Sequence, residues 1–264
     1  MSDFSAYFQA LAALDMAVLE PVEVGPHENC ALDEVLARAL GRGECGPHLR
    51  VWVQRAPQIV IGSGQSVANE VDEAACERRG ITISRRSSGG GAMFMLPGDA
   101  ITYSVVVPTR VLDGLSFQDS YELLDAFAVA ALNRLGVPAF YVPINDIATS
   151  RAKIAGAAQK RFASGVTLHH TTASYQIDDA MMRECLRIGA PAVNERGHRS
   201  AAKDVDAIAN YVSESREQVI AALVEEFSKR FDVRPAQVSE QHLAAARELT
   251  TSKYATPEWI YRIP

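Results

Sequence analysis

Apolar residues recur at helical spacing near both ends of the chain and at places between them. Between residues 4 and 20 they fall on one stripe of a 3.6-residue period, and Pro21 follows, which predicts a helix over this stretch. The same periodicity indicates further helices, several of which end at a glycine. They cover residues 30–40, 69–79 (starting at 69 or 70), 116–135, 181–188, 215–231 and 239–249.

Short runs that favour β-structure separate these helices and predict strands. The runs cover residues 49–54, 58–61, 81–86, 92–96, 101–107, 139–142, 147–149, 153–158 and 166–177. Helices and strands do not alternate strictly, as they would in a doubly wound parallel sheet. The order predicts an α+β fold with mixed, mostly antiparallel sheets flanked by helices. No repeat or linker divides the chain, so we expect residues 1–264 to form a single domain.

The composition is that of a globular protein, with 48% apolar and 22% charged residues among 264. The 26 Lys and Arg against 32 Asp and Glu residues give a net charge of −6, which argues against nucleic acid as a partner. The longest apolar runs, such as residues 101–108, are too short to cross a bilayer, and residues 1–10 contain no Lys or Arg. We therefore expect a cytoplasmic protein without membrane association.

The strongest local signal is the run RRSSGGGA, in which Arg85 and Arg86 end a predicted strand and two serines and three glycines follow. Glycine lets backbone N–H groups approach a phosphate closely, and arginine supplies a permanently charged fork. The run therefore predicts an anion-binding loop, although a flexible hairpin with solvated arginines has the same pattern. It is not a P-loop, because no Gly-Lys-Ser/Thr opens a helix here.

A second signal is the pair Asn145-Asp146, with Lys153 seven positions after Asp146. If the two flanking runs form a hairpin, the Asp146 carboxylate and the Lys153 ammonium lie close together. A lysine in an apolar strand needs a charge partner, because burial of an unpaired ammonium is costly. That partner is either a bound anion or Asp146 itself, and the spacing favours neither.

The spacing of histidines and cysteines gives little support for a metal site. His169 and His170 are neighbours in a predicted strand, so their rings point to opposite faces and do not coordinate the same metal ion. We expect one ring to face a pocket or the core and the other to face solvent. The cysteines form no CxxC pair, which indicates neither a zinc knuckle nor a disulfide framework. They are Cys30, Cys45, Cys76 and Cys185.

These segments, in this order, resemble the lipoate–protein ligase family, which is related to octanoyltransferases and biotin protein ligases. Residues 85–94 (RRSSGGGAMF) are similar to the family pattern RRxSGGGAVFH. Residues 145–159 (NDIATSRAKIAGAAQ) are similar to its ND…K[IV]SGSA segment, and residues 165–171 (GVTLHHT) to its HHGT strand. The resemblance extends over nearly the whole chain and implies the α+β catalytic domain of that family.

The resemblance implies an ATP-dependent reaction with Mg²⁺. Lipoate would be joined to AMP, and the lipoyl group would then pass to a lysine of a lipoyl-accepting protein domain. Carried over residue by residue, the match implies that Lys153 is catalytic, and that Asp146 holds Mg²⁺ or orients Lys153. It implies nucleotide contacts from Arg85, Arg86, Gly90, Gly91, Ala92, Met93, Phe94, Asn145 and Lys153. It implies lipoate contacts from Ser88, Gly89, Lys153, Gly156 and His169.

The chain departs from the family pattern at three places. Met95 stands where the family has histidine, Ile144 where it often has arginine, and Thr171 where HHGT has glycine. Met95 and Ile144 keep open a non-catalytic protein that only binds lipoyl domains or lipoate. The longest family members also continue into a small accessory domain. We expect this chain to lack that domain and a separately encoded small subunit to supply it.

An octanoyltransferase is the other alternative, because it would carry the acyl group on a cysteine thioester without ATP. In related transferases the cysteine lies near the Asn-Asp pair or in a loop after the histidine strand. Residues 141–147 and 193–200 contain no cysteine. Cys185 lies in a predicted helix, where we expect it to pack in the core. The sequence therefore favours the ligase.

Overall fold

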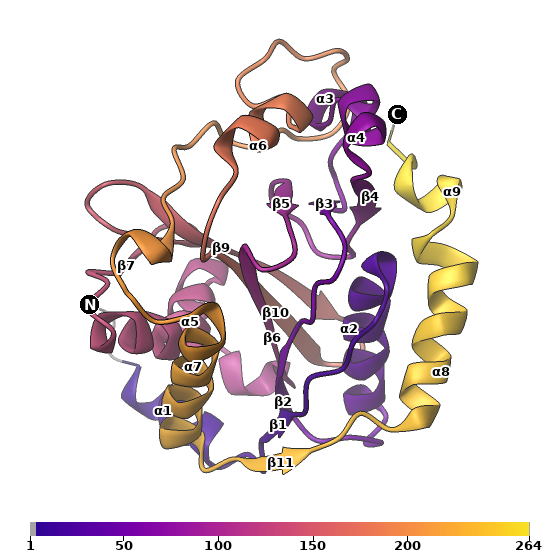
Figure 1. The fold of residues 1–264 in the computed structure, drawn as a ribbon. Coiled ribbons are helices and arrows are strands. Elements are labelled where there is room, and N and C mark those ends of the chain that lie inside the picture. Colours follow the sequence, from indigo (N-terminus) through magenta and orange to yellow (C-terminus); the bar gives the residue numbers. More distant parts are fainter. Residues whose placement is uncertain (1–3, 264) are drawn as a thin grey trace.

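The computed structural model describes residues 4–263, and the fold centres on an eight-stranded sheet (Figure 1). Its strand order is β11-β1-β2-β6-β10-β9-β8-β7. The pairs β11–β1 and β1–β2 are parallel, and the other neighbours are antiparallel. The strands are β1 (Ala17–Leu19), β2 (His48–Val51), β6 (Ala100–Pro108), β7 (Phe140–Val142), β8 (Asp146–Ala148), β9 (Lys153–Phe162), β10 (Val166–Ser174) and β11 (Arg234–Ala236).

Helices cover both faces of this sheet (Figure 1). On one face Phe127 and Phe227 make edge-to-face contacts with each other and with Tyr103 and Phe231. Helices α1 (Ser5–Ala12), α5 (Phe117–Arg134) and α7 (Arg216–Phe231) lie on this face, and α2 (Pro26–Gly41) and α8 (Glu240–Leu249) on the other. Within residues 4–263, none of the helices combines the length and apolar character needed to span a bilayer.

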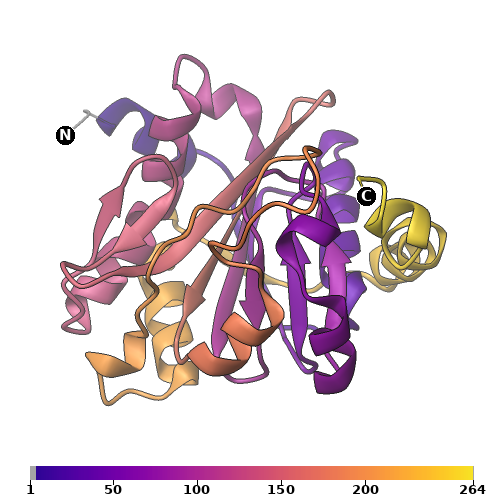
Figure 2. The ribbon, with the colours of Figure 1, turned by 90° about the horizontal axis from the view of Figure 1, so that it is seen from above.

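A smaller sheet stands beside the large one (Figure 2). Its central strand β3 (Gln58–Ile61) pairs in parallel with β4 (Thr82–Arg85) and antiparallel with β5 (Met93–Met95). The glycine-rich loop joins β4 to β5 and therefore crosses the carboxyl end of β3. Short helical elements complete the fold. They are α3 (Val67–Glu70), α4 (Glu73–Arg79), η1 (Thr109–Leu112), α6 (Asp179–Cys185), η2 (Ile208–Asn210), η3 (Thr250–Tyr254) and α9 (Pro257–Ile260).

The α+β class with mixed, mostly antiparallel sheets is confirmed, but the first predicted helix is wrong beyond Ala12. Residues Ala17–Leu19 form β1, which pairs with β2 and β11. The side chains of Met16 and Leu19 are buried by this sheet. A three-residue buried strand places its apolar residues too close together for their period to separate it from a helix. Strand β11, which contains Pro235 at the sheet edge, was not predicted.

Other boundaries also differ from prediction, for example at α2, which begins at Pro26 instead of Cys30, and at β9, which extends to Phe162. The helix predicted over residues 69–79 is two helices, because Asp72 leaves the helical conformation and caps α4 with its carboxylate. The strand predicted over residues 166–177 ends at Ser174, and the helix predicted over residues 181–188 begins two residues earlier as α6. The two helix starts follow from the carboxylates of Asp72 and Asp178, which cap α4 and α6.

Candidate active site

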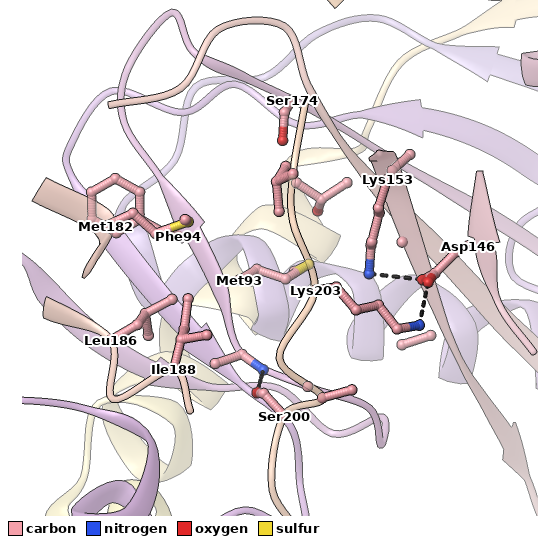
Figure 3. Close-up of a pocket in the computed structure, with 18 of the residues that line it drawn as sticks. Met93, Phe94, Asp146, Lys153, Ser174, Met182, Leu186, Ile188, Ser200 and Lys203 are labelled. Atoms are coloured by element: carbon pink, nitrogen blue, oxygen red, sulfur yellow. Dashed lines mark hydrogen bonds and ion pairs between the residues drawn. The ribbon is translucent and has the colours of Figure 1, made fainter. Parts of the chain in front are cut away.

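A cavity of about 220 Å³ lies between β9 and the small sheet (Figure 3). Residues 153–158 of β9 form one wall, and residues 91–94, at the end of the glycine-rich loop and the start of β5, form the facing wall. Residues 199–205 and the region of α6 close the remaining sides. The fold therefore brings the glycine-rich loop and the Asn145–Lys153 hairpin to one cavity.

Arg86 is buried and holds the glycine-rich loop in shape. Its guanidinium donates to the carbonyl oxygens of Val60 (3.0 Å), Gly89 (2.6 Å) and Gly91 (2.8 Å). Burial lowers the pKa of Arg86 to about 10, and no carboxylate among the described residues offsets this effect. A buried cation that lacks a carboxylate partner is stabilised by a bound anion. Because Arg86 also lines the cavity, it marks the anion-binding side of the site.

A chain of buried polar contacts supports this loop from behind. Ser88 Oγ accepts from Arg86 Nε (3.1 Å) and lies 2.6 Å from Nε2 of His170. Nδ1 of His170 lies 3.5 Å from Asp33, which also accepts from Arg50 (2.6 Å). Burial lowers the pKa of His170. Helix α2 and strand β10 therefore fix the position of the loop through a neutral histidine.

Gly62 lets the turn after β3 lie directly against the loop. A Cβ at this position would overlap the carbonyl oxygen of Gly90. Next to it, the N–H of Ser63 donates to the carbonyl oxygen of Ser88 (2.8 Å). The loop is thus braced by backbone contacts on one side and by the contacts of Arg86 on the other.

Lys153 lies at the start of β9, and its ammonium reaches Asp146 on β8. Nζ is 2.7 Å from Oδ1 of Asp146, whose side chain is only 4% exposed. The lysine side chain passes over Gly156, where a Cβ would overlap Nζ. Gly156 is the cross-strand partner of Asp146. The close approach that a hairpin would give is therefore confirmed, and glycine at this position makes room for the ammonium.

A second lysine, which the sequence did not predict, joins this pair. Nζ of Lys203 bonds to Oδ2 of Asp146, so one buried carboxylate holds two ammonium groups (Figure 3). Lys203 belongs to residues 193–206, a segment without helix that passes over the molecule between the two sheets (Figure 2). No periodicity or motif in the sequence marks this segment, and only the fold brings Lys203 to the cavity.

This segment is anchored to the glycine-rich loop and to α3. Ser200 Oγ accepts from the backbone N–H of Ala92 (2.8 Å) and donates to Glu70. The carboxylate of Glu70, which is buried, also accepts from the backbone N–H of Ser200 (3.1 Å). The Ala92 N–H group, from which we expected a nucleotide contact, is therefore bonded to Ser200 in this structure.

The cavity has an apolar side that faces the lysines. Phe94, Met182, Leu186 and Ile188 gather there (Figure 3), and Ile177 lies in the same apolar cluster. Charged groups at one end and hydrocarbon at the other suit a ligand with an anionic head and an apolar tail.

The predicted site residues divide into those that line the cavity and those that lie behind it. Ser88 and Gly89 do not line it, but both contact the guanidinium of Arg86. Gly90 lies against the same guanidinium. These three residues act on the cavity through Arg86. The predicted residues that line the cavity are Arg86, Gly91, Ala92, Met93, Phe94, Asn145, Asp146, Lys153 and Gly156.

Arg85 is turned away from the cavity. Its Nε and one terminal nitrogen donate to the carbonyl oxygen of Ile260 (2.9 and 2.6 Å). The other terminal nitrogen donates to the carbonyl oxygens of Gly62 (3.0 Å) and Gln65 (2.6 Å). The side chain is fully buried and ties β4 to α9. A direct nucleotide contact from Arg85 does not fit this arrangement.

The two histidines point to opposite faces of the large sheet, as predicted, but the expected exposure of one ring is wrong. Both rings are buried, because α5 covers His169 and α2 covers His170. His169 Nε2 lies 2.8 Å from Asp125 and its Nδ1 lies 3.1 Å from Gln159. The lipoate contact expected from His169 does not fit, because the side chain faces away from the cavity.

The described residues do not build a Mg²⁺ site at Asp146. Both of its carboxylate oxygens are bonded to lysine ammonium groups. Across residues 4–263, no group of three or more His, Cys, Asp and Glu side chains gathers as metal ligands would. Mg²⁺ commonly reaches nucleotide sites on the phosphates of the substrate. Asp146 instead fits the other implied role, which is to orient Lys153.

No thiol lines the cavity within the described part of the chain. Cys185 is fully buried, and burial raises its pKa. Burial also raises the pKa of Cys30 and of Cys76 to about 12, and that of Cys45 to about 11. All four thiols are therefore protonated at neutral pH and lack the thiolate character of a cysteine nucleophile.

Comparison with known proteins decides the family. The model of the lipoyl protein ligase A/B catalytic domain matches residues 25–228, which include the glycine-rich loop, the Asn145–Lys153 hairpin and both histidines. The chain belongs to the lipoyl protein ligase A/B catalytic domain family. In this chain the cavity lies between the glycine-rich loop and the Asn145–Lys153 hairpin, both within the matched residues.

Relatives within the lipoyl protein ligase A/B family carry two different activities in their names. Octanoyltransferase LipM of Exiguobacterium sp. is 29% identical, over 93% of this chain and 97% of that protein. Lipoate-protein ligase A subunit 1 of Thermoplasma acidophilum is also 29% identical, over 88% of this chain and 90% of that protein. Sequence identity therefore does not separate the two activities.

Solved ligase structures share the fold of this lipoyl protein ligase A/B domain. A chain from the structural analysis of a bi-partite lipoate protein ligase and its E2 lipoyl domain, both of Thermoplasma acidophilum, gives a TM-score of 0.79 at 25% identity. It covers 95% of this chain and 97% of that chain. A lipoate-protein ligase A bound with ATP gives 0.78 at 26% identity, over 95% and 100%. The protein is thus an enzyme of the lipoate ligase and octanoyltransferase family.

Proposed function

We propose that this protein is an ATP-dependent lipoate–protein ligase that forms lipoyl-AMP and transfers the lipoyl group to a lysine of a lipoyl-accepting domain. The observation that carries the proposal is the composition of the cavity. Arg86, Lys153 and Lys203 line it together with an apolar wall, and no thiol lines it within residues 4–263. Arg187 and Arg199 also line the cavity, and Arg199 lies 3.9 Å from Glu70. Such a concentration of cations suits a reaction in which a carboxylate must approach a nucleotide phosphate.

In the first step a carboxylate oxygen of lipoate attacks the α-phosphorus of ATP, the bond to the β-phosphate oxygen breaks, and pyrophosphate leaves. The Lys153 ammonium, held over Gly156 by Asp146, contacts both anions and reduces their repulsion. Arg86 keeps the glycine-rich loop against the nucleotide. The hydrocarbon chain and the dithiolane ring pack on the side that Phe94 and its apolar neighbours form.

In the second step the neutral ε-amine of the acceptor lysine attacks the acyl carbon. The bond from that carbon to the phosphate oxygen breaks, AMP leaves, and the amine loses a proton to solvent. Lys153 stabilises the negative charge that develops on the acyl oxygen. One ammonium therefore serves both steps, because the acyl carbonyl and the α-phosphate share the same position beside it.

Acyl transfer through a cysteine thioester is the second candidate, because LipM relatives are named octanoyltransferases. That reaction needs a thiolate beside the lysine. Cys185 is fully buried, and its pKa is raised by burial. These two properties support the ligase over the transferase.

ATP–pyrophosphate exchange that requires lipoate tests the proposal. With ATP, Mg²⁺, lipoate and a lipoyl domain, intact mass should also show a lipoyl gain on the acceptor. We expect Lys153→Ala to lower the exchange rate by about 100-fold or more, because it removes the cation that both anions share. Cys185→Ala should keep the rate of the unmodified protein.

Two other outcomes would overturn the proposal. Octanoyl transfer from acyl carrier protein without ATP, abolished by Cys185→Ala, would make the protein a transferase. Binding of a lipoyl domain with neither exchange nor transfer would make it a non-catalytic binder.

We also propose that a separately encoded small subunit supports adenylation. The support is that one relative is named subunit 1 of a ligase and that a similar solved ligase is called bi-partite. Addition of such a subunit should raise the exchange rate. Adenylation at full rate by this chain alone, with no rise on addition, would refute this part of the proposal.

A further inference from the structure

Lys203 lines the cavity but belongs to no motif found in the sequence. The carboxylate that it contacts, Asp146, is also paired with Lys153. Oδ1 of Asp146 lies 2.7 Å from Lys153, and Oδ2 bonds to Lys203. One carboxylate is enough to neutralise the ammonium of Lys153. The second ammonium therefore leaves the three-residue group with an excess of one positive charge beside the cavity.

The backbone of Lys203 is fixed on both sides. The carbonyl oxygen of Asp204 accepts from the N–H of Lys153 (3.3 Å), and the N–H of Asp206 donates to the Lys153 carbonyl (2.8 Å). On the other side Ser200 is bonded to Ala92 and Glu70. The Cα of Lys203 is therefore held in place relative to both Lys153 and the glycine-rich loop.

The side chain of Lys203 is open to solvent while its partner is not. It is 43% exposed, compared with 30% for the side chain of Lys153 and 4% for that of Asp146. A lysine ammonium has three N–H donors on a flexible stem and turns toward an anion at little cost. A side chain that lines a cavity in this way is available to a ligand.

We propose that Lys203 is a second anion-binding residue of the site and that it contacts a phosphate group of the nucleotide substrate. This inference rests on the proposed function. In this structure Asp146 holds both ammonium groups beside the cavity. When the nucleotide binds, Lys203 donates to a phosphate oxygen, and Lys153 remains between the carboxylate of lipoate and the α-phosphate.

The test compares ATP binding by calorimetry in Lys203→Met, Lys203→Arg and the unchanged protein. Lys203→Met should raise the Kd for ATP by about tenfold, since it removes one charged contact to phosphate. Lys203→Arg should recover most of this loss, and the Kd for lipoate should stay within about twofold in both variants. The KM for ATP in the exchange assay should rise more than kcat falls.

Lys229→Met is the matched control, because Lys229 is also a half-exposed lysine paired with one carboxylate and lies on α7. It should leave both affinities unchanged. Unfolding in urea shows whether each variant is folded, and Lys203→Gln replaces Lys203→Met if the latter is not.

The outcomes separate the two proposals. If the unchanged protein binds no ATP, the proposed ligase function fails, and the inference fails with it. If that protein binds ATP and Lys203→Met binds it equally well, only the inference fails. An equal loss of ATP and lipoate affinity in Lys203→Met would also overturn it, because this pattern indicates a structural role through Asp146.

Discussion

The neighbouring residues His169 and His170 on β10 belong to two buried groups of polar contacts, one on each face of the large sheet. On the side of α5, His169 Nε2 lies 2.8 Å from Oδ1 of Asp125. The same oxygen accepts hydrogen bonds from Tyr103 (2.6 Å) and Thr171 (2.7 Å). All of these side chains are buried. The contacts of this group stay within the core between α5 and the sheet.

On the side of α2, the contacts of His170 lead outward to the cavity. From Asp33 they pass through His170 to Ser88, then to Arg86, and end at the carbonyl of Gly91. Arg86 and Gly91 line the cavity. Both groups are buried His–Asp pairs, so burial and pairing do not tell them apart. The difference is whether the chain of contacts reaches a surface that a substrate touches.

The largest effect is expected where the α2-side contacts reach the cavity. Arg86→Met removes a buried cation and leaves three carbonyl oxygens without their donor, so pyrophosphate exchange should fall by about 100-fold or more. Arg134→Met is the control, since Arg134 pairs with Glu225 on the α5–α7 side. Exchange by Arg86→Met within threefold of the unchanged protein would contradict the assigned role.

Gly156→Ala tests the position of the Lys153 ammonium without removing its charge. The new Cβ would displace Nζ, a flexible group, so stability should change little while exchange falls by about 10- to 100-fold. Gly25→Ala serves as the control, because its Cβ would meet only Glu28 at 3.8 Å. An unchanged exchange rate in Gly156→Ala, together with normal folding, would show that the ammonium position does not matter.

The paired variants His170→Gln and His169→Gln compare the two faces directly. His170→Gln should raise the KM for ATP by about tenfold, because Ser88 and Arg86 lose their support. His169→Gln should leave the KM unchanged and lower the free energy of unfolding by about 1–3 kcal/mol. Kinetics and urea unfolding of both variants measure these effects, and the same KM change in both would remove the distinction between the faces.

The smallest effect concerns pH on the α2 side, where burial lowers the pKa of His48 to about 4. The folded protein holds this ring neutral, whereas the unfolded chain protonates it near its ordinary pKa of 6.5. The unfolded chain therefore binds more protons, and the free energy of unfolding falls as the pH falls through this window. We expect His48 to contribute about 1 kcal/mol to the loss between pH 7.5 and 6.

Urea unfolding at the two pH values measures this contribution. His48→Phe should show a smaller pH dependence than the unchanged protein by that amount. Equal pH dependence in the two proteins would show that His48 does not titrate between the folded and unfolded states.

The fold could be predicted from the sequence where one segment carries all of its own signals. Helix α5 is an example, because Ser116 caps it and its apolar stripe lies within the same residues. Strands β1 and β11 carry no such signal. Ala17 pairs with Arg234, more than 200 residues later, and only the complete fold brings them together.

The site, like the fold, could be predicted only where its residues are close together in the sequence. Asp146 and Lys153 are seven residues apart and meet across a hairpin, so their spacing was informative. Lys203 reaches Asp146 from 57 positions away on a segment without periodicity, and no local pattern marks it. The sequence also does not distinguish Arg85 from Arg86. They are adjacent at the end of β4, and the backbone turns one toward α9 and the other toward the loop.

The contact between Arg85 and Ile260 bears on how the enzyme is made. The two residues are 175 positions apart, and Ile260 lies in the last turn of the described chain. During synthesis the ribosome releases that turn long after β4 has emerged. Until then, the Arg85 guanidinium lacks the Ile260 carbonyl as its acceptor. Closing so long a stretch of polypeptide is slow and late. We therefore expect the tie between β4 and α9 to form late in the folding of newly made chains.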